Sequence, residues 1–269
     1  MTMPLPALPP TLGLLQVPST WQRIDFLSDV HLHPDEAATA AAWRAHLLHT
    51  PADAIVILGD LFEVWVGDDD DDPFVRRCID TLAQAAQRCP VYFMCGNRDF
   101  LAGDGLMRAS GMQPLSDPTV LAIGPTRWLL SHGDALCLED TDYLTFRAQV
   151  RSDEWQRAFL ARPLAERVQT ARALRAQSEQ RKQTQTQYAD VDTAATLHWL
   201  QAAQCEGLVH GHTHRARTHT LHTGHWRWVL SDWDARSTPP RLEVSCWLRQ
   251  TAPSERAGPA GLHRLPLSA

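Results

Sequence analysis

The stretch Ile24-Asp25-Phe26-Leu27-Ser28-Asp29-Val30-His31 decides the fold. Its mostly apolar first half, residues 24–27, predicts a buried strand, and Asp29 and His31 follow where that strand ends. Side chains two positions apart share one face of an extended chain, so this carboxylate and this imidazole are expected to point to the same side. Residues 28–31 therefore supply half of a metal site.

Four later stretches are candidates for the other half of this site. They are Gly59-Asp60, Gly96-Asn97-Arg98-Asp99, His132-Gly133-Asp134 and Gly211-His212-Thr213-His214. Each is weak evidence alone, because a lone Asn is common in turns and a lone His can be a satisfied interior residue. Most of the five stretches directly follow an apolar run, and this ordered set is specific. We expect them to converge on a pair of divalent metal ions that hydrolyse a phosphate ester.

The first half of the chain alternates between strand and helix patterns. Strands are predicted at residues 24–27, 54–58 and 91–95, with helices at 35–49 and 74–88 between them. Residues 120–123 and 128–130 predict paired strands, and residues 217–249 predict antiparallel strands. This order is typical of an α/β fold with parallel pairing and right-handed crossovers. Ligands bind beyond the carboxyl ends of such strands, where the candidate residues lie.

Residues 141–204 break this alternation and predict a helical insertion. Apolar residues recur there at helical spacing, namely Trp155, Phe159, Leu160, Leu164 and Val168, and the insertion also holds Leu174. Between Arg147 and Lys182 there are nine basic and four acidic residues, a local charge of +5. One interpretation is a solvated pair of surface helices. The other is a lid over the site, whose basic face meets an anionic substrate or an anionic membrane surface.

The chain is expected to comprise a core and peripheral segments. The core is predicted at residues 21–140 and 205–250, and the insertion, or lid, at 141–204. Five prolines predict a flexible arm over residues 1–20, and residues 251–269 are expected to form a loose tail.

Composition excludes several classes of function. The formal net charge of −6 gives no reason to expect nucleic-acid binding. Six Cys without a C-x-x-C pair indicate neither a zinc ribbon nor a disulfide framework. No apolar run approaches the roughly 20 residues that span a bilayer, and no signal peptide is recognisable. We expect a cytoplasmic protein that can rest on a membrane surface, and no obligate protein partner is indicated.

The candidate ligands divide into two overlapping sets. Asp29, His31, Asp60 and His214 could surround one ion, and Asp60, Asn97, His132 and His212 a second, with Asp60 bridging. Carboxylate, amide and imidazole donors without thiolate suit Mn²⁺, Mg²⁺, Fe²⁺ or Zn²⁺. Two carboxylates leave a charge of about +2 on two divalent ions, which suits a phosphate or diphosphate.

The five motifs in this order resemble the calcineurin-like metallophosphoesterase superfamily over roughly residues 22–235. Residues 28–32, 59–69, 96–100 and 132–134, with the insertion after Asp140, are similar to the UDP-2,3-diacylglucosamine diphosphatases of lipid A biosynthesis. The resemblance implies a four-layer α+β sandwich in which helices flank two mixed sheets. It also implies hydrolysis of the substrate's diphosphate with two Mn²⁺, by water attack on the α-phosphorus, at the cytoplasmic face of the inner membrane. The products would be UMP and 2,3-diacylglucosamine 1-phosphate.

The resemblance also implies a role for individual residues. The implied metal ligands are Asp29, His31, Asp60, Asn97, His132, His212 and His214, of which Asp60, Asn97 and His132 are also the implied catalytic residues. The implied substrate contacts are Asn97, Arg98, Asp140, Ser178, Lys182 and His212. The chain departs from some members at two positions, with Lys182 where they have Asn and Gln185 where they have Lys.

Several residues have a structural alternative. Arg98 can bind phosphate through two parallel hydrogen bonds, or pair with a neighbour such as Asp99. The apolar residues of the insertion can line a slot for acyl chains, or simply pack on the core. The acidic run 68–72 is interpreted as a solvated loop at the rim of the site, and His210 as a structural residue.

Two other functions share these features. A metallophosphoesterase acting on a soluble nucleotide or a phosphoprotein would need the same metal ligands. A binding or scaffold module could keep the fold without catalysis, although such modules usually lack one or more ligands and all seven are present here.

Overall fold

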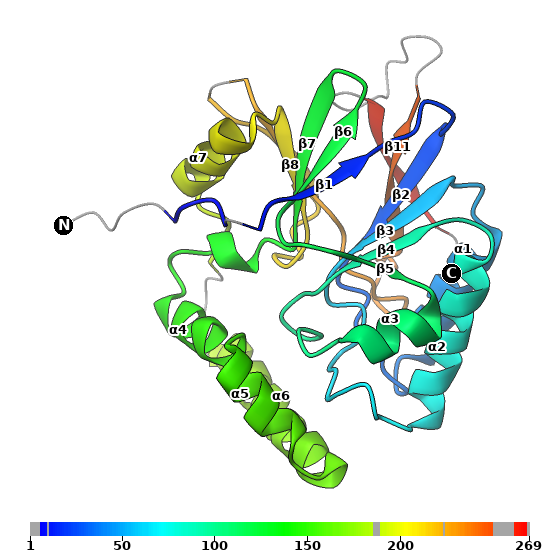
Figure 1. Cartoon of the computed structure of the whole chain (residues 1–269), viewed down its shortest axis with the longest axis vertical. Coiled ribbons are helices and arrows are strands. Elements are labelled where there is room, and N and C mark those ends of the chain that lie inside the picture. Colours follow the sequence, from blue (N-terminus) through cyan, green and yellow to red (C-terminus); the bar gives the residue numbers. More distant parts are fainter. Residues whose placement is uncertain (1–5, 10, 185–188, 223, 250–260, 268–269) are drawn as a thin grey trace.

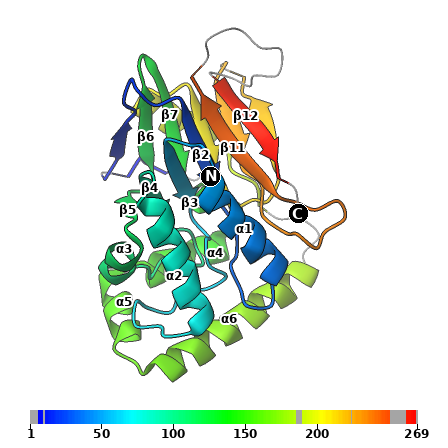
Figure 2. The same ribbon diagram turned by 90° about the vertical axis from the view of Figure 1, so that its right-hand side faces the viewer.

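The computed structural model describes residues 6–9, 11–184, 189–222, 224–249 and 261–267, with the backbone alone for residues 175–184. Two six-stranded mixed sheets lie face to face, with helices on their outer sides (Figures 1 and 2). The first sheet is ordered β1 (Gly13–Gln16), β6 (Thr119–Ile123), β7 (Thr126–Ser131), β8 (Gly207–His210), β10 (Trp226–Val229) and β9 (Arg217–Thr220). The second is ordered β12 (Leu262–Pro266), β11 (Glu243–Leu248), β2 (Arg23–Leu27), β3 (Ala54–Leu58), β4 (Val91–Met94) and β5 (Gln113–Leu115).

Seven α-helices accompany the sheets in the described part of the chain. They are α1 (Ala37–His49), α2 (Pro73–Ala86), α3 (Asp104–Ser110), α4 (Thr141–Val150), α5 (Asp153–Leu160), α6 (Leu164–Thr184) and α7 (Thr193–Ala203). The helices α1, α2 and α3 lie along the second sheet, and α7 lies beside the first (Figure 1). The predicted class, two mixed sheets flanked by helices in four layers, is confirmed.

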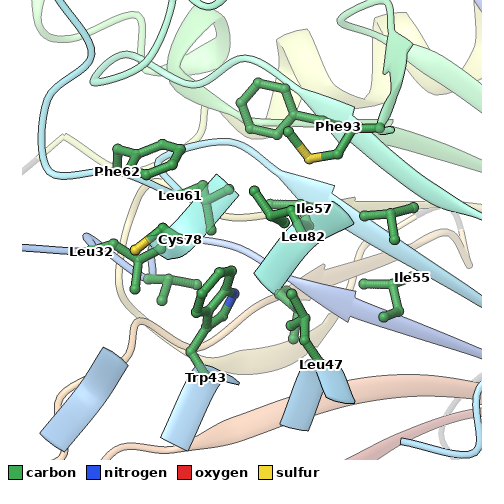
Figure 3. Close-up of a cluster of buried hydrophobic side chains, with 14 of the residues drawn as sticks. Leu32, Trp43, Leu47, Ile55, Ile57, Leu61, Phe62, Cys78, Leu82 and Phe93 are labelled. Atoms are coloured by element: carbon green, nitrogen blue, oxygen red, sulfur yellow. The ribbon is translucent and has the colours of Figure 1, made fainter. Parts of the chain in front are cut away.

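Three apolar clusters hold the layers together, and strand β3 shows how. Ile55 and Ile57 point outward, where Trp43 of α1 and Leu82 of α2 cover them (Figure 3). The alternate residues Ala54, Val56 and Leu58 face the other sheet. All five β3 residues are buried, as expected for a central parallel strand covered on both sides. A third cluster packs Trp199 and Leu200 of α7 against the outside of the first sheet.

The two terminal segments correct the predicted domain boundaries. Residues 13–16 were expected to belong to a flexible arm, but they form β1, which pairs in parallel with β6. Residues 262–266 were expected to lie in a loose tail, but they form β12, antiparallel to β11. In both cases the edge of a sheet offers backbone hydrogen bonds that the local composition does not reveal. Residues 1–5 and 251–260 lie outside the described residues.

The insertion is smaller than predicted. Helix α7 was assigned to the lid, but its buried face completes the core of the first sheet. Helices α4 to α6 form the actual insertion and extend away from the sheets (Figure 1). Arg167 of α6 is almost fully buried and donates a hydrogen bond of 2.5 Å to the Val66 carbonyl. The described residues contain no helix that is long and apolar enough to cross a membrane.

A buried carboxylate in β2 ties the helical layer to the second sheet. Asp25 accepts hydrogen bonds from Arg23 Nε at 2.6 Å and from the Thr50 hydroxyl at 2.5 Å, and His46 Nε2 lies 3.1 Å away. Burial opposes ionisation of this carboxyl, but His46, Arg23 and Thr50 outweigh it and lower the pKa of Asp25 below its ordinary value. Its ionised form therefore stabilises the fold.

We expect Asp25→Asn to lower the free energy of unfolding at pH 7 by about 2 kcal/mol, because the buried donors around it lose their charged acceptor. A carboxyl whose pKa is depressed on folding contributes stability above its unfolded pKa of about 3.9 and loses it below. The difference between the wild type and the variant should therefore shrink as the pH falls below about 4. Urea unfolding across this range measures both effects, with the exposed Asp80→Asn as control. An unchanged unfolding free energy at pH 7 would contradict this role.

Candidate metal centre

The five sequence motifs lie just past the ends of five strands. Strand β2 leads to Asp29 and His31, β3 to Asp60, and β4 to Asn97, and these three strands are mutually parallel neighbours. Strand β7 leads to His132, and its parallel neighbour β8 leads to His212 and His214. The carboxyl ends of both parallel sets meet at the same edge of the two sheets, as expected for ligand-binding residues in open α/β sheets.

The seven predicted ligands come together there in two groups. Donor atoms of Asp29, His31 and His214 all lie within 4.8 Å of one another, as do those of Asp60, His132 and His212. The amide oxygen of Asn97 joins the second group, 3.0 Å from His132 Nε2 and 2.8 Å from His212 Nδ1.

The two groups are linked through the backbone of one ligand residue. The His212 N–H donates a hydrogen bond of 2.9 Å to the Asp29 carboxylate, so the two groups are directly adjacent. Asp60 falls in the second group, where its Oδ1 lies 3.7 Å from His132 Nε2. Its bridging role stays a prediction.

Five of these residues have left-handed backbone conformations. The φ angles are 53° for Asp29, 51° for His31, 54° for Asp60, 65° for His212 and 54° for His214. This region costs a non-glycine residue roughly 1–2 kcal/mol, and it persists where the surroundings enforce it. The Asp29 N–H is held by the Gly59 carbonyl and the His31 N–H by the Asp60 carbonyl.

This geometry changes the reason for which Asp29 and His31 meet. They were expected to share the face of an extended strand, but the strand has already ended at Leu27. Their side chains meet because both residues turn through the left-handed region. His212 and His214 also have positive φ angles, but they enter different donor groups, so of these two pairs only Asp29 and His31 converge.

Glycines make room for the ligands at close quarters. A Cβ at Gly96 would lie 2.2 Å from Asp60 Oδ1, and one at Gly59 would lie 2.6 Å from His132 Nδ1. A Cβ at Gly211 would lie 2.3 Å from Asp29 Oδ2. These contacts explain why a glycine precedes Asp60, Asn97 and His212 in the motifs.

A hydrogen bond in one case and a close carboxylate in the other turn one nitrogen of each of two histidines toward its group. His132 Nδ1 lies 2.8 Å from the Leu58 carbonyl, which can only accept, so that nitrogen carries the proton and Nε2 faces the group. His31 Nδ1 lies 3.1 Å from a carboxylate oxygen of Glu63, which leaves His31 Nε2 facing His214 Nε2 at 3.3 Å. Metal-ligating histidines are oriented through their second nitrogen in this way.

The charges of the second group also favour a bound cation. Burial opposes the charged form of His132, but Asp60 and Asp134 outweigh it and raise the pKa of His132 to about 9. Burial and the neighbouring His132 lower the pKa of His212 to about 4. The carboxylates thus draw a proton into a fully buried place where a metal ion would supply the positive charge. Oxygen and imidazole donors without thiolate fit a divalent ion of the Mn²⁺, Mg²⁺, Fe²⁺ or Zn²⁺ kind.

Three acidic residues behind the ligands, Glu63, Asp99 and Asp134, were not predicted as site residues, although all lie within the motifs of the sequence. Asp99 is buried and accepts hydrogen bonds of 2.7 Å from the Gly96 and Leu61 N–H groups, so it joins the Asn97 loop to the Asp60 loop. Burial and the charge of Asp60 raise the pKa of Asp99 to about 6. Asp99 was named as a salt-bridge partner for Arg98, but the carboxylate nearest the Arg98 guanidinium is Glu63, at 3.8 Å.

Helix α4 reaches the centre through residues that the sequence did not single out. The Tyr143 ring stacks on the His212 ring with centroids 5.9 Å apart, and its hydroxyl donates to the buried carboxylate of Asp134 at 2.5 Å. Arg147 Nε donates to the same carboxylate at 2.8 Å. Arg151 donates to the Gly96 carbonyl at 2.8 Å. No periodic signal marks these three: Arg147 and Arg151 stand out only as two of the nine basic residues counted in the insertion, and Arg151 directly follows the helix.

The predicted substrate contacts of the insertion are described only in part. Asp140 caps α4, where its carboxylate accepts from the Tyr143 N–H at 3.1 Å. Ser178 and Lys182 fall within α6, but their side chains lie outside the described residues, as does Gln185.

Charged and buried groups near the rim have structural partners. Asp68 accepts from the Gly103 and Gly105 N–H groups at the start of α3, and Asp72 caps α2. Asp69 pairs with Arg167. The acidic run is therefore an anchor for three helices and not merely solvated. Burial and Arg227 lower the pKa of His210 to about 3, which agrees with its interpretation as a neutral structural residue.

The fold and this centre define the chain as a metallophosphoesterase. The family model for calcineurin-like phosphoesterases matches residues 22–216. A UDP-2,3-diacylglucosamine hydrolase of Chromobacterium violaceum is 47% identical over 219 residues, covering 78% of this chain and 90% of the relative. Proteins of the same name from Bordetella pertussis (41% identical, covering 80% and 87%) and Aromatoleum aromaticum (43% identical, covering 77% and 88%) are also similar. The chain belongs to the calcineurin-like phosphoesterases and, among them, to the UDP-2,3-diacylglucosamine hydrolase family. The resemblance seen in the sequence is thereby confirmed, and the protein is a hydrolase.

We expect Gly96→Ala to weaken metal binding by about 100-fold, because the added methyl group would displace the Asp60 carboxylate. Metal content after loading and dialysis measures this loss. Gly124→Ala is the matched control, since its φ of 57° strains an alanine while no atom lies within 4 Å of the new Cβ. Equal metal content in both variants would show that Asp60 does not depend on Gly96.

Proposed function

We propose that this chain hydrolyses the diphosphate of UDP-2,3-diacylglucosamine in lipid A biosynthesis, using two Mn²⁺. Water attacks the α-phosphorus, and UMP and 2,3-diacylglucosamine 1-phosphate are the products. The observation that carries the proposal is the pair of donor groups at one sheet edge in a chain whose relatives bear this substrate in their names.

The two donor groups divide the work of holding the metal ions. Asp29, His31 and His214 would hold one ion, and Asp60, Asn97, His132 and His212 the other, with Asp60 shared between them. When bound, two divalent ions supply charge that polarises the phosphate and acidifies a water molecule. Manganese suits the donor set, and availability selects it over ions that bind more tightly.

Other side chains bind and orient the substrate. Arg98 can give two parallel hydrogen bonds to a phosphate, and Glu63 at 3.8 Å steadies its guanidinium. Asn97 and His212 contact the substrate from the metal centre, and Asp140, Ser178 and Lys182 from the insertion. His132 is held by the Leu58 carbonyl, so its Nε2 keeps its direction during turnover.

The insertion offers apolar surface for the acyl chains. Phe159 is buried, and its ring stacks on that of Trp155 with centroids 4.8 Å apart, so these two residues pack the insertion on the core. Leu160 and Leu174 are 40% and 39% exposed, and a Cβ at Gly67 would lie 3.1 Å from Leu160, which places Leu160 at the seam between insertion and core. The acyl chains would cover this seam, and the protein would rest on the cytoplasmic face of the inner membrane to receive them.

We expect Asp60→Ala to lower kcat by more than roughly 100-fold, because losing a shared ligand removes more than the loss of an outer partner. Turnover of the diacylated UDP-sugar with Mn²⁺ measures it. In ¹⁸O-labelled water the label should appear in UMP, since the α-phosphorus stays with the nucleoside. Label in the lipid phosphate would exclude attack at the α-phosphorus. Cleavage of cyclic nucleotides or a phosphopeptide, with none of the acylated UDP-sugar, would favour a different substrate.

We expect Leu160→Asp to raise KM by about tenfold, because a charge at the seam removes apolar contact worth about 1.4 kcal/mol with an acyl chain, while kcat changes little. Steady-state kinetics with the diacylated substrate test this, with Ala158→Asp, at an exposed position of α5, as the control whose KM should stay normal. In a flotation assay, a smaller fraction of the Leu160→Asp variant than of the wild type should rise with anionic phospholipid vesicles. An unchanged KM would place the acyl chains elsewhere.

A further inference from the structure

The basic residues at the start of the insertion are turned toward the core. The nine cations between Arg147 and Lys182 suggested a basic outer face. Instead, Arg147 and Arg151 lie 2.8 and 3.6 Å from the buried carboxylate of Asp134. Arg167 pairs with Asp69 at the other end of the insertion. These three charges have partners within the protein before any substrate arrives.

Arg151 contacts the loop that carries one of the candidate metal ligands. Its Nη2 donates a hydrogen bond of 2.8 Å to the carbonyl of Gly96, which belongs to the peptide unit that leads into Asn97. The N–H of Gly96 is held by Asp99 at 2.7 Å. The next N–H along the chain after Asn97, that of Arg98, is held by Asp60 at 2.8 Å. Asn97 is therefore fixed on both sides, and Arg151 is the part of this frame that comes from the insertion.

The guanidinium of Arg151 is itself held in place. Asp134 balances its charge, and its carbon lies 5.9 Å from the centre of the Phe100 ring, on the same loop as Asn97. Its side chain is 23% exposed, so most of it is packed. Because the Arg151 guanidinium is packed and bonded to the Gly96 carbonyl, it fixes the position of that backbone segment. It is not a free cation that could bind a substrate phosphate from solvent.

We propose that Arg151, anchored by Asp134, is a positioning residue that sets the Asn97 amide against His132 and His212. The insertion then completes the metal centre as well as covering it. The inference rests on the proposed metal centre, but it does not depend on the identity of the substrate. The proposed substrate and the proposed role of Arg151 can therefore be refuted independently of each other.

Binding of Mn²⁺ alone distinguishes this role from the alternatives, because the expected change has an unusual sign. Removing a positive charge near a cation site should strengthen cation binding by Coulomb's law. Losing the frame around Asn97 should weaken one of two bound Mn²⁺ by roughly 10–100-fold, as for other partners that orient ligands. The free-ion signal of Mn²⁺ in electron paramagnetic resonance gives both affinities without any turnover.

The variants are Arg151→Met, which removes the donor, and Arg151→Lys, which keeps a donor of similar reach. We expect Arg151→Met to weaken one ion and leave the other unchanged, and Arg151→Lys to restore that affinity to within about threefold of the wild type. The control is Arg157→Met on the exposed side of α5, where Arg157 contacts only its own helix among the described interactions. It should bind Mn²⁺ as the wild type does.

Several outcomes would overturn the inference. If Arg151→Met binds both ions as tightly as the wild type and only KM rises, Arg151 is a substrate contact. If Arg151→Lys is as weak as Arg151→Met, a donor to the Gly96 carbonyl is not what matters. Should Arg151→Met fail to fold by circular dichroism, the lysine variant decides, since normal Mn²⁺ affinity in it is required. A wild type that binds two Mn²⁺ but leaves the acylated UDP-sugar intact would refute the proposed function and leave this test standing.

Discussion

The oxygen and nitrogen atoms of the candidate ligands crowd together at one edge of the two sheets. The rest of the structure holds them in this arrangement. Asn97 Oδ1 lies 2.8 and 3.0 Å from two imidazole nitrogens, and two further imidazole nitrogens face each other at 3.3 Å. Asp29, Asp60 and His132 are buried, so water cannot relieve the crowding around them, and burial alone would neutralise the two carboxylates. A divalent ion in each donor group would satisfy these donor atoms. Bringing these donor atoms together therefore costs free energy, which bound metal ions would offset.

Part of this free-energy cost is backbone strain at the candidate ligands, and hydrogen bonds from neighbouring loops offset it. Five candidate ligands sit in the left-handed region, and four of them come in pairs separated by one residue. Other ligand-bearing loops hold these turns: the carbonyls of Gly59 and Asp60 hold the N–H groups of Asp29 and His31, and the Asp29 carboxylate holds the N–H group of His212. Glycines at the closest approaches remove the side chains that would collide with the ligands. The ligand loops thus support one another, and none could adopt its conformation alone.

Sequence patterns predicted the strands, the motif residues and the layer arrangement, because burial on both faces gives β3 and its neighbours uninterrupted apolar runs. They could not predict the left-handed turns, since Asp and His carry no local signal for a positive φ comparable to that of glycine. Strands β1 and β12 were missed because a sheet edge is a tertiary partner, invisible in a proline-containing segment. Asp99 and Asp134 stood in the motifs, yet their role as hidden acceptors depends on loops that are distant in sequence. The roles of the seven ligands as metal donors stay predictions.

Whether an arginine of the insertion faces the core or solvent is the least predictable of these features. The answer changes the charge that the insertion presents to its surroundings. A local excess of arginine indicates a basic segment, but the count does not say which guanidinium groups are paired. Arg147, Arg151 and Arg167 face buried or loop carboxylates, so their contribution to an outward electrostatic field is largely cancelled. These three residues therefore offer little positive charge to an anionic surface, whereas Leu160 and Leu174 are exposed apolar side chains of the insertion. The same three pairs fasten the insertion helices to the core.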